Sequence, residues 1–136
     1  MIYLMFDGRC KEALGLYEKA FGAKILELKQ YKDTNNPSFP VEEHQMEWVL
    51  NSHMDIFGML VMAADAPSRS SSGDNMLVHI MPKTVEEAER AWEALLEEGS
   101  KVFMKPTQTF FAKFHASIKD KYGVNWMFTV TQDYVG

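Results

Sequence analysis

The chain has 136 residues, 46% hydrophobic and 24% charged, a composition that fits one globular domain with its own core and excludes a disordered chain. Its 19 acidic residues outnumber 14 basic ones, and the net charge of -5 argues against nucleic acid as a partner, because phosphate binding takes clustered Lys and Arg. No apolar stretch approaches the roughly 20 residues that span a bilayer, so no membrane partner is expected. The single cysteine, Cys10, excludes an intrachain disulfide and favours an intracellular, cytoplasmic protein.

The first half of the chain is predicted to hold four strands and one helix. The apolar residues of 10–21 recur at helical spacing, which predicts an amphipathic helix, and Gly22 is placed to end it in the left-handed conformation. Residues 33–43 carry turn chemistry and are predicted to form a polar loop. The strands are expected at residues 1–6, 24–31, 45–54 and 59–64.

The second half repeats this pattern after a linker. Residues 65–74 contain a proline, three successive serines and a glycine, which makes them the best linker candidate in the chain. Thr84 can N-cap a helix in which Glu87 completes a capping box, and Gly99 is placed to end that helix. The strands are expected at residues 75–81, 101–104, 110–118 and 124–131.

The two halves can be aligned on their helices. The segment Gly22-Ala23-Lys24-Ile25 after the first helix matches Gly99-Ser100-Lys101-Val102 after the second, and the same order of elements surrounds both. This match indicates an internal duplication, in which each copy alone would have too small a core. We therefore predict an α+β fold: a single domain, residues 1–136, built from two β-α-β-β-β modules at about 1–65 and 74–136.

Three segments of the chain resemble one protein family. They are residues 3–14 (YLMFDGRCKEAL), His53 with residues 64–67 (ADAP), and residues 108–114 (QTFFAKF) followed by Asp120, Gly123 and Trp126. Together they resemble PhnB-like proteins of the glyoxalase/bleomycin resistance/dioxygenase superfamily, also called vicinal oxygen chelate proteins. The resemblance implies two curved, half-open sheets around a cleft that binds a small molecule, and a homodimer.

The resemblance also implies where enzymes of this superfamily hold a divalent metal ion. The four ligand positions fall near Ile2, Met62, Leu77 and Met127, and none of these side chains offers an oxygen or imidazole ligand. His79 lies two residues after Leu77 on the same face of its predicted strand, but one histidine without partners makes no metal site. We expect no metal and no other cofactor, and we interpret His79 as a hydrogen-bonded structural histidine.

The predicted strand at 110–118 gives the most informative candidates for the cleft. Continuous alternation would place Gln108, Phe110 and Phe114 on one face, where aromatic rings and one amide suit a small-molecule pocket. Two packed core faces explain the same pattern equally well. No catalytic residue is assigned, and the hypothetical ligand-binding set is His53, His79, Gln108, Phe110, Phe114 and Trp126.

Two functions of different classes stay open. The first is a protein that binds a small apolar or aromatic molecule in its cleft without a metal. The second is an isomerase, lyase or dioxygenase-type enzyme of the same superfamily, in which His53, His79 or His115 would act as acid or base. A methyltransferase, a name that some family members carry, gets no support, because the sequence has no glycine-rich turn between strand and helix for a nucleotide-like cofactor.

Overall fold

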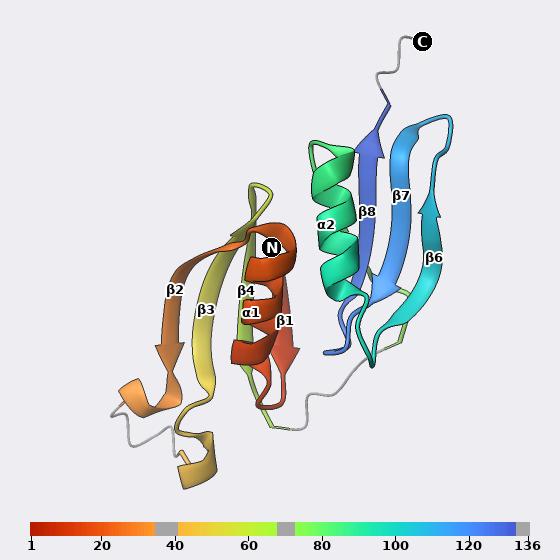
Figure 1. Cartoon of the computed structure of the whole chain (residues 1–136). Helices are drawn as coiled ribbons and strands as arrows, with labels where there is room; N and C mark the ends of the chain where they lie inside the picture. Colours follow the sequence, from red (N-terminus) through yellow and green to blue (C-terminus); the bar gives the residue numbers. More distant parts are fainter. Residues whose placement is uncertain (35–40, 68–72, 133–136) are drawn as a thin grey trace. The chain divides into compact units, whose positions relative to one another are not determined.

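The computed structural model describes residues 1–34, 41–67 and 73–132, and its cartoon is shown in Figure 1. The contacts of the backbone divide the chain into two compact units. Unit 1 contains residues 1–18 and 23–70, and unit 2 contains residues 19–22 and 71–136. The last turn of the first helix therefore belongs to unit 2 by its contacts. Within the described ranges, no helix is long and apolar enough to cross a membrane.

Unit 1 is a four-stranded mixed sheet with one helix. Its strands follow the order β1-β4-β3-β2, so β1 and β2 are the edges. The strands β1 and β4 pair in parallel, and the other neighbours pair antiparallel. Short 3-10 turns at Tyr31–Asp33 and Glu43–Gln45 lie between β2 and β3. The elements are β1 (Ile2–Phe6), α1 (Cys10–Phe21), β2 (Lys24–Gln30), β3 (Val49–Ile56) and β4 (Met59–Asp65).

Unit 2 repeats this arrangement. Its strands follow the order β5-β8-β7-β6, so β5 and β6 are the edges, and again the first strand of the unit pairs in parallel with the last. The elements are β5 (Val78–Ile80), α2 (Val85–Leu95), β6 (Lys101–Thr107), β7 (Ala112–Lys119) and β8 (Asn125–Thr131). The predicted fold class is confirmed: the chain is α+β, with two mixed sheets that each carry a helix.

In unit 2, the helix α2 covers one face of the sheet. In unit 2, Trp92 of α2 contacts Phe128 of β8 at 6.1 Å between ring centroids, so α2 covers the face that carries Phe128. Because side chains alternate along a strand, Met127 and Thr129 lie on the opposite face. We call this opposite face the open face of unit 2. It carries His79 of β5, Met127 and Thr129 of β8, and His115 and Ser117 of β7.

The pairing registers of the two sheets are consistent with the duplication. In unit 1, Met62 of β4 lies between Tyr3 of β1 and His53 of β3. In unit 2, Met127 of β8 lies in the same way between His79 of β5 and Ser117 of β7. Cross-strand partners point to the same face, so each unit has a row of three side chains built around a methionine. His79 and Tyr3 therefore occupy equivalent positions.

Several predicted boundaries need correction. The helix α2 ends at Leu95 with Leu96 as its C-cap, four residues before Gly99, whose φ of 94° places it in the following turn. Gly22, with φ of 63°, ends α1 as predicted. The strand β3 starts at Val49 rather than 45, so His53 lies inside it. Of the predicted loop and linker, residues 35–40 and 68–72 lie outside the described residues.

The start of β7 also differs from the prediction, and a side chain explains the difference. The hydroxyl oxygen of Thr109 accepts hydrogen bonds from the backbone N–H groups of Phe111 and Ala112, at 3.2 and 3.0 Å. A threonine that bonds to the backbone two and three residues later fixes a turn. Residues 108–111 are therefore a loop, and Gln108 and Phe110 do not share a strand face with Phe114.

Candidate ligand-binding face

The open face of unit 2 holds a cluster of three hydrogen-bonded polar side chains. Thr129 lies on β8 between two histidines from the strands on either side. Its Oγ1 lies 2.8 Å from Nε2 of His79 on β5 and 3.1 Å from Nδ1 of His115 on β7. Thr129 is buried, His115 is half-buried and His79 is exposed. The hydrogen bond agrees with the interpretation of His79 as a hydrogen-bonded histidine, and its partner is Thr129, which the sequence did not indicate.

Aromatic side chains lie beside this cluster. The ring of Phe111 lies 5.2 Å from the ring of His115, and the ring of Phe110 lies 5.2 Å from that of Phe111. Phe110 is 81% exposed and Phe111 is 42% exposed, which is unusual for such large apolar side chains. Gln108, in the same loop, is also exposed. The loop 108–111 and the open face together combine polar groups with uncovered aromatic surface.

Phe114 and Trp126 lie on the other face, under α2. Phe114 is 5% exposed and contacts Phe128 at 6.4 Å between ring centroids. Trp126 is fully buried and donates its indole N–H to Oδ2 of Asp120 at 2.9 Å. A buried tryptophan needs a partner for this N–H, and Asp120 supplies it inside the core. This placement agrees with the second explanation of the sequence pattern, a packed core face.

His53 belongs to unit 1. It lies in the middle of β3, half-buried, with Glu27 and Met62 as its cross-strand partners. It therefore lies on the open side of its sheet, because its neighbours Ser52 and Met54 are fully buried. The structure thus brings His79 together with His115 and Thr129, and it places His53 on the other unit.

The positions where the superfamily would hold a metal do not fit one. Ile2, Met62, Leu77 and Met127 offer no hard or borderline ligand atom, because the only heteroatom in these side chains is the soft thioether sulfur of the methionines. Of these positions, Met127 pairs with His79 on one side and Ser117 on the other, which gives one imidazole and one hydroxyl beside it. Among the residues that the structure describes, no group of three His, Cys, Asp or Glu side chains is arranged to hold a metal ion.

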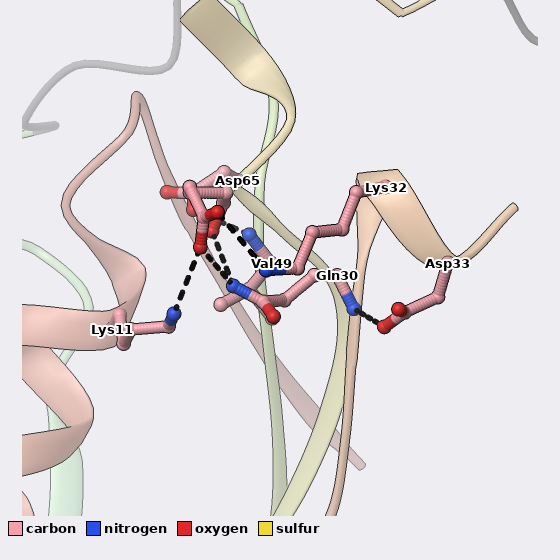
Figure 2. A network of polar contacts seen from close by, with 7 residues as sticks. Lys11, Gln30, Lys32, Asp33, Val49 and Asp65 are labelled. Atoms are coloured by element: carbon pink, nitrogen blue, oxygen red, sulfur yellow. Dashed lines mark hydrogen bonds and ion pairs between the residues drawn. The ribbon is translucent and has the colours of Figure 1, made fainter.

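A buried carboxylate, which sequence analysis missed, accepts hydrogen bonds from the backbone at the start of α1. Oδ1 of Asp65, at the end of β4, accepts the backbone N–H groups of Gly8 and Cys10, both at 2.9 Å. Its Oδ2 accepts the N–H of Val49 at 2.9 Å, as Figure 2 shows. Asp65 is 2% exposed. Since these amides already have a partner, the turn before α1 is not a ready site for the phosphates of a nucleotide-like cofactor.

Figure 2 also shows Lys11, Gln30 and Lys32 gathered at this end of unit 1. All three contact the carboxylate of Glu47, at 3.8, 3.0 and 3.0 Å. The pKa of Glu47 is lowered most by the hydrogen bond from Lys32 and next by the hydrogen bond from Gln30. The side chain of Glu47 is exposed, and exposed ion pairs contribute little. This cluster is therefore a surface feature rather than a candidate site.

Cys10 is fully buried, and burial, with a smaller contribution from Asp65, raises the pKa of its thiol to about 12. We expect this group to make stability fall at high pH. An unfolded thiol loses its proton near pH 8.5 while the folded one keeps it, so the free energy of unfolding decreases by about 1.4 kcal/mol per pH unit above about pH 9. Urea unfolding at several pH values measures this slope. Burial also raises the pKa of Tyr31, so this tyrosine steepens the slope above about pH 10.

The variant Cys10→Ala is the control, because it removes the thiol and keeps a small apolar side chain. Its stability should stay level between about pH 9 and 10, where the tyrosine does not yet titrate. The same slope in Cys10→Ala and in the natural sequence would show that the thiol is not the cause.

The fold defines the class of the protein. The structure is similar to a glyoxylase/bleomycin resistance protein/dioxygenase domain from Frankia sp. EAN1pec, with a TM-score of 0.65, 10% sequence identity, and coverage of 96% of this chain and 94% of that one. At this identity the likeness concerns the fold alone. The chain has the glyoxalase/bleomycin resistance fold.

The family follows from the sequence. A family model described as 3-demethylubiquinone-9 3-methyltransferase matches residues 1–129, and the chain belongs to this family. It is similar to a PhnB protein from Bacillus cereus, with a TM-score of 0.75, 25% identity, and coverage of 96% of this chain and 98% of that one. It is also 29% identical to protein YjdN of Escherichia coli (strain K12), over 96% of this chain and 93% of the relative. The resemblance to PhnB-like proteins is confirmed.

Proposed function

We propose that the protein binds a small, apolar or aromatic molecule, without a metal, on the open face of unit 2. One observation carries this proposal: the bonded cluster of His79, Thr129 and His115 lies beside the exposed rings of Phe110 and Phe111. Small-molecule sites combine apolar walls with a few fixed polar groups. The hydroxyl of Thr129 holds both imidazoles in place, and the phenylalanine rings offer a surface on which an aromatic ligand can pack.

The methyltransferase activity in the family's description is not part of this proposal. Such an activity needs a methyl donor, and the amides at the start of α1 are bonded to Asp65. At the start of α2, the N–H of Glu87 is bonded to Thr84. Binding on the open face of unit 2 does not involve the backbone amides at the N-terminus of either helix.

An isomerase or lyase is the second candidate, and the same cluster favours it. Imidazoles are the commonest general acids and bases near neutral pH. The hydrogen bonds of His79 and His115 to one hydroxyl would allow one ring to take up a proton while the other releases one. Binding comes first in both candidates, so the first experiment tests binding.

The test uses indole, a neutral aromatic probe, and the variant Phe111→Ala. We expect indole to shift the NMR signals of the His115 ring and of the loop 108–111. The variant should weaken indole binding about fivefold or more, because stacking on an aromatic ring contributes about 0.5–1.5 kcal/mol beyond the area that it buries. NMR titration of 15N-labelled protein measures both effects.

Leu96→Ala is the matched control for this experiment. Leu96 is a large apolar residue that is 50% exposed and lies at the end of α2, away from the open face. Its loss should leave indole binding unchanged. Indole shifts that spread over both faces, or that are equally weakened in the two variants, would contradict a site at Phe111.

A further inference from the structure

We propose that His79, Thr129 and His115 form a proton relay, in which the group that a bound molecule presents to His115 decides which nitrogen of His79 carries its hydrogen. This inference rests on the proposed function for its ligand, a small aromatic molecule whose ring edge donates or accepts a hydrogen bond. Three observations carry it: the two bonds of one hydroxyl, the different exposure of the two imidazoles, and the lack of acidic residues on the strands of unit 2.

The first observation concerns the hydrogen of the Thr129 hydroxyl. Its Oγ1 lies 2.8 Å from Nε2 of His79 and 3.1 Å from Nδ1 of His115, and among the described residues it has no other hydrogen-bond partner. Thr129 is 6% exposed, and a buried donor needs an acceptor. The hydroxyl therefore donates to one of the two rings, and the other ring donates its own N–H to Oγ1.

This arrangement couples the two imidazoles. A neutral imidazole carries its one N–H on Nδ1 or on Nε2. If the hydroxyl donates to His115, that ring carries its hydrogen on Nε2, and so does His79, which donates to Oγ1. If the hydroxyl donates to His79, both rings carry their hydrogen on Nδ1. While both rings are neutral they therefore share the same form, and one cannot change without the other.

The second observation concerns the two ends of this row. The ring nitrogens that Thr129 does not use lie at opposite ends, because β8 lies between β5 and β7. They are Nδ1 of His79 and Nε2 of His115, and within the described ranges no hydrogen bond uses either one. His79 is exposed, so its end is open to water. His115 is half-buried with its ring 5.2 Å from that of Phe111, so a molecule that packs on Phe111 lies beside this end.

The third observation is that no carboxylate locks the row in one form. A carboxylate beside a histidine commonly fixes which ring nitrogen carries the hydrogen. The strands β5, β6, β7 and β8 contain no aspartate or glutamate. The acidic residues of α2 belong to the helix that covers the opposite face. A bound molecule can therefore select either form through the bond that it makes to His115.

One passage of the relay moves one proton and leaves the cluster neutral. In the form with both hydrogens on Nε2, His115 gives its Nε2 hydrogen to the bound molecule and takes the hydroxyl hydrogen of Thr129 on Nδ1. His79 gives its Nε2 hydrogen to Oγ1 and takes a proton from solvent on Nδ1. The reverse passage takes a proton from the bound molecule and releases one to solvent. An isomerase needs both passages, because it removes a proton from its substrate and returns one.

The first test uses the free protein. In buffer basic enough that neither ring shows the doubly protonated signal, 15N NMR of the histidine rings measures the fraction of each ring that carries its hydrogen on Nε2. We expect equal fractions for His79 and His115. Thr129→Val keeps the shape and removes the hydroxyl, so the two fractions should differ. Thr129→Ser should keep them equal, and so should Thr131→Val, which changes an exposed threonine two residues along β8.

The second test compares indole with quinoline under the same conditions. Indole has an N–H that donates to Nε2 of His115, whereas quinoline has a ring nitrogen that accepts from it. We expect the ratio of the two forms of His79 to differ about fivefold or more between the probes, the factor that one hydrogen bond typically supplies. His115 should change in the same direction, and His53 is the internal control that should not change. Thr129→Val should abolish the response of His79 and keep that of His115.

The outcomes separate the relay from the proposed function. Unequal fractions in the free natural sequence, or a response of His115 without one of His79, would overturn the relay and leave the proposed function intact. A response of His79 that persists in Thr129→Val would also overturn the relay, because the probe would then act on His79 directly. Binding of neither probe would remove the proposed function and, with it, the control of the relay by a ligand.

Discussion

Replacing Asp65 with alanine is expected to destabilise the protein by about 3–5 kcal/mol, the largest effect of any polar substitution in unit 1. The buried carboxylate accepts the N–H groups of Gly8, Cys10 and Val49, and its removal leaves all three donors without this partner. The donors of Cys10 and Val49 are buried, and each buried donor left unpaired costs about 1–3 kcal/mol, whereas the part-buried N–H of Gly8 adds less because water can reach it. Urea unfolding followed by circular dichroism measures the loss, and hydrogen exchange of the three amides should show that it begins at the start of α1.

Asp55→Ala is the matched control for this variant. Asp55 also accepts a backbone N–H, from Gly58 at 2.7 Å, but the bond is exposed to water. Its loss should cost no more than about 1 kcal/mol, because water replaces the lost partner. If the two alanine variants are destabilised equally, the three bonds of Asp65 do not hold the start of α1.

Phe114→Ala is expected to cost about 3–5 kcal/mol, as for other buried phenylalanines, and to leave aromatic ligands bound. Phe114 and Phe21 are 5% and 6% exposed, and both contact Phe128, at 6.4 and 6.3 Å. The two truncations should therefore lower the melting temperature by similar amounts. The sequence-based hypothesis of a pocket at Phe114 predicts the opposite, a distinctly smaller loss for Phe114→Ala than for Phe21→Ala.

The control for this prediction is Phe111→Ala, which changes a phenylalanine of the loop before β7. Its side chain is far more exposed, so its truncation should cost less than about 1 kcal/mol. The pair of variants thus separates stability from binding: Phe114→Ala lowers the stability of the fold, and Phe111→Ala lowers the affinity for indole. A stable Phe114→Ala variant that loses indole binding would place the ligand on the face under α2.

The fold could be predicted because its signals are local and occur twice. The helical spacing before Gly22 and the cap at Thr84 each follow from a few neighbouring residues, and the structure has both. The repeated order of elements then fixed the class of fold. The boundary of β7 could not be predicted in this way. The side chain of Thr109 bonds to the backbone ahead of it, and an alternating pattern of aromatic residues does not reveal such a turn.

The candidate site was harder to predict than the fold, because its residues are brought together by strand pairing. His79 and Thr129 are 50 positions apart in the sequence, and only the parallel pairing of β5 with β8 brings them within hydrogen-bonding distance. Asp65 was missed for a similar reason, since its partners lie up to 57 positions away. A signal was present for Asp65: it directly follows a predicted apolar strand, and a carboxylate that is buried there needs hydrogen-bond donors.

The edge strands of the two sheets differ in how well they are protected against pairing with a strand of another chain. The edges β2 and β6 carry lysines, and β6 also contains Pro106, features that discourage a foreign strand from pairing there. The edges β1 and β5, with the sequences IYLMF and VHI, have no lysine, aspartate, glutamate or proline. Their unprotected backbone is therefore where accidental aggregation would start if these strands were left uncovered. Selection against such aggregates would act on β1 and β5 first, and a lysine placed at Tyr3 would be the simplest safeguard against strand addition.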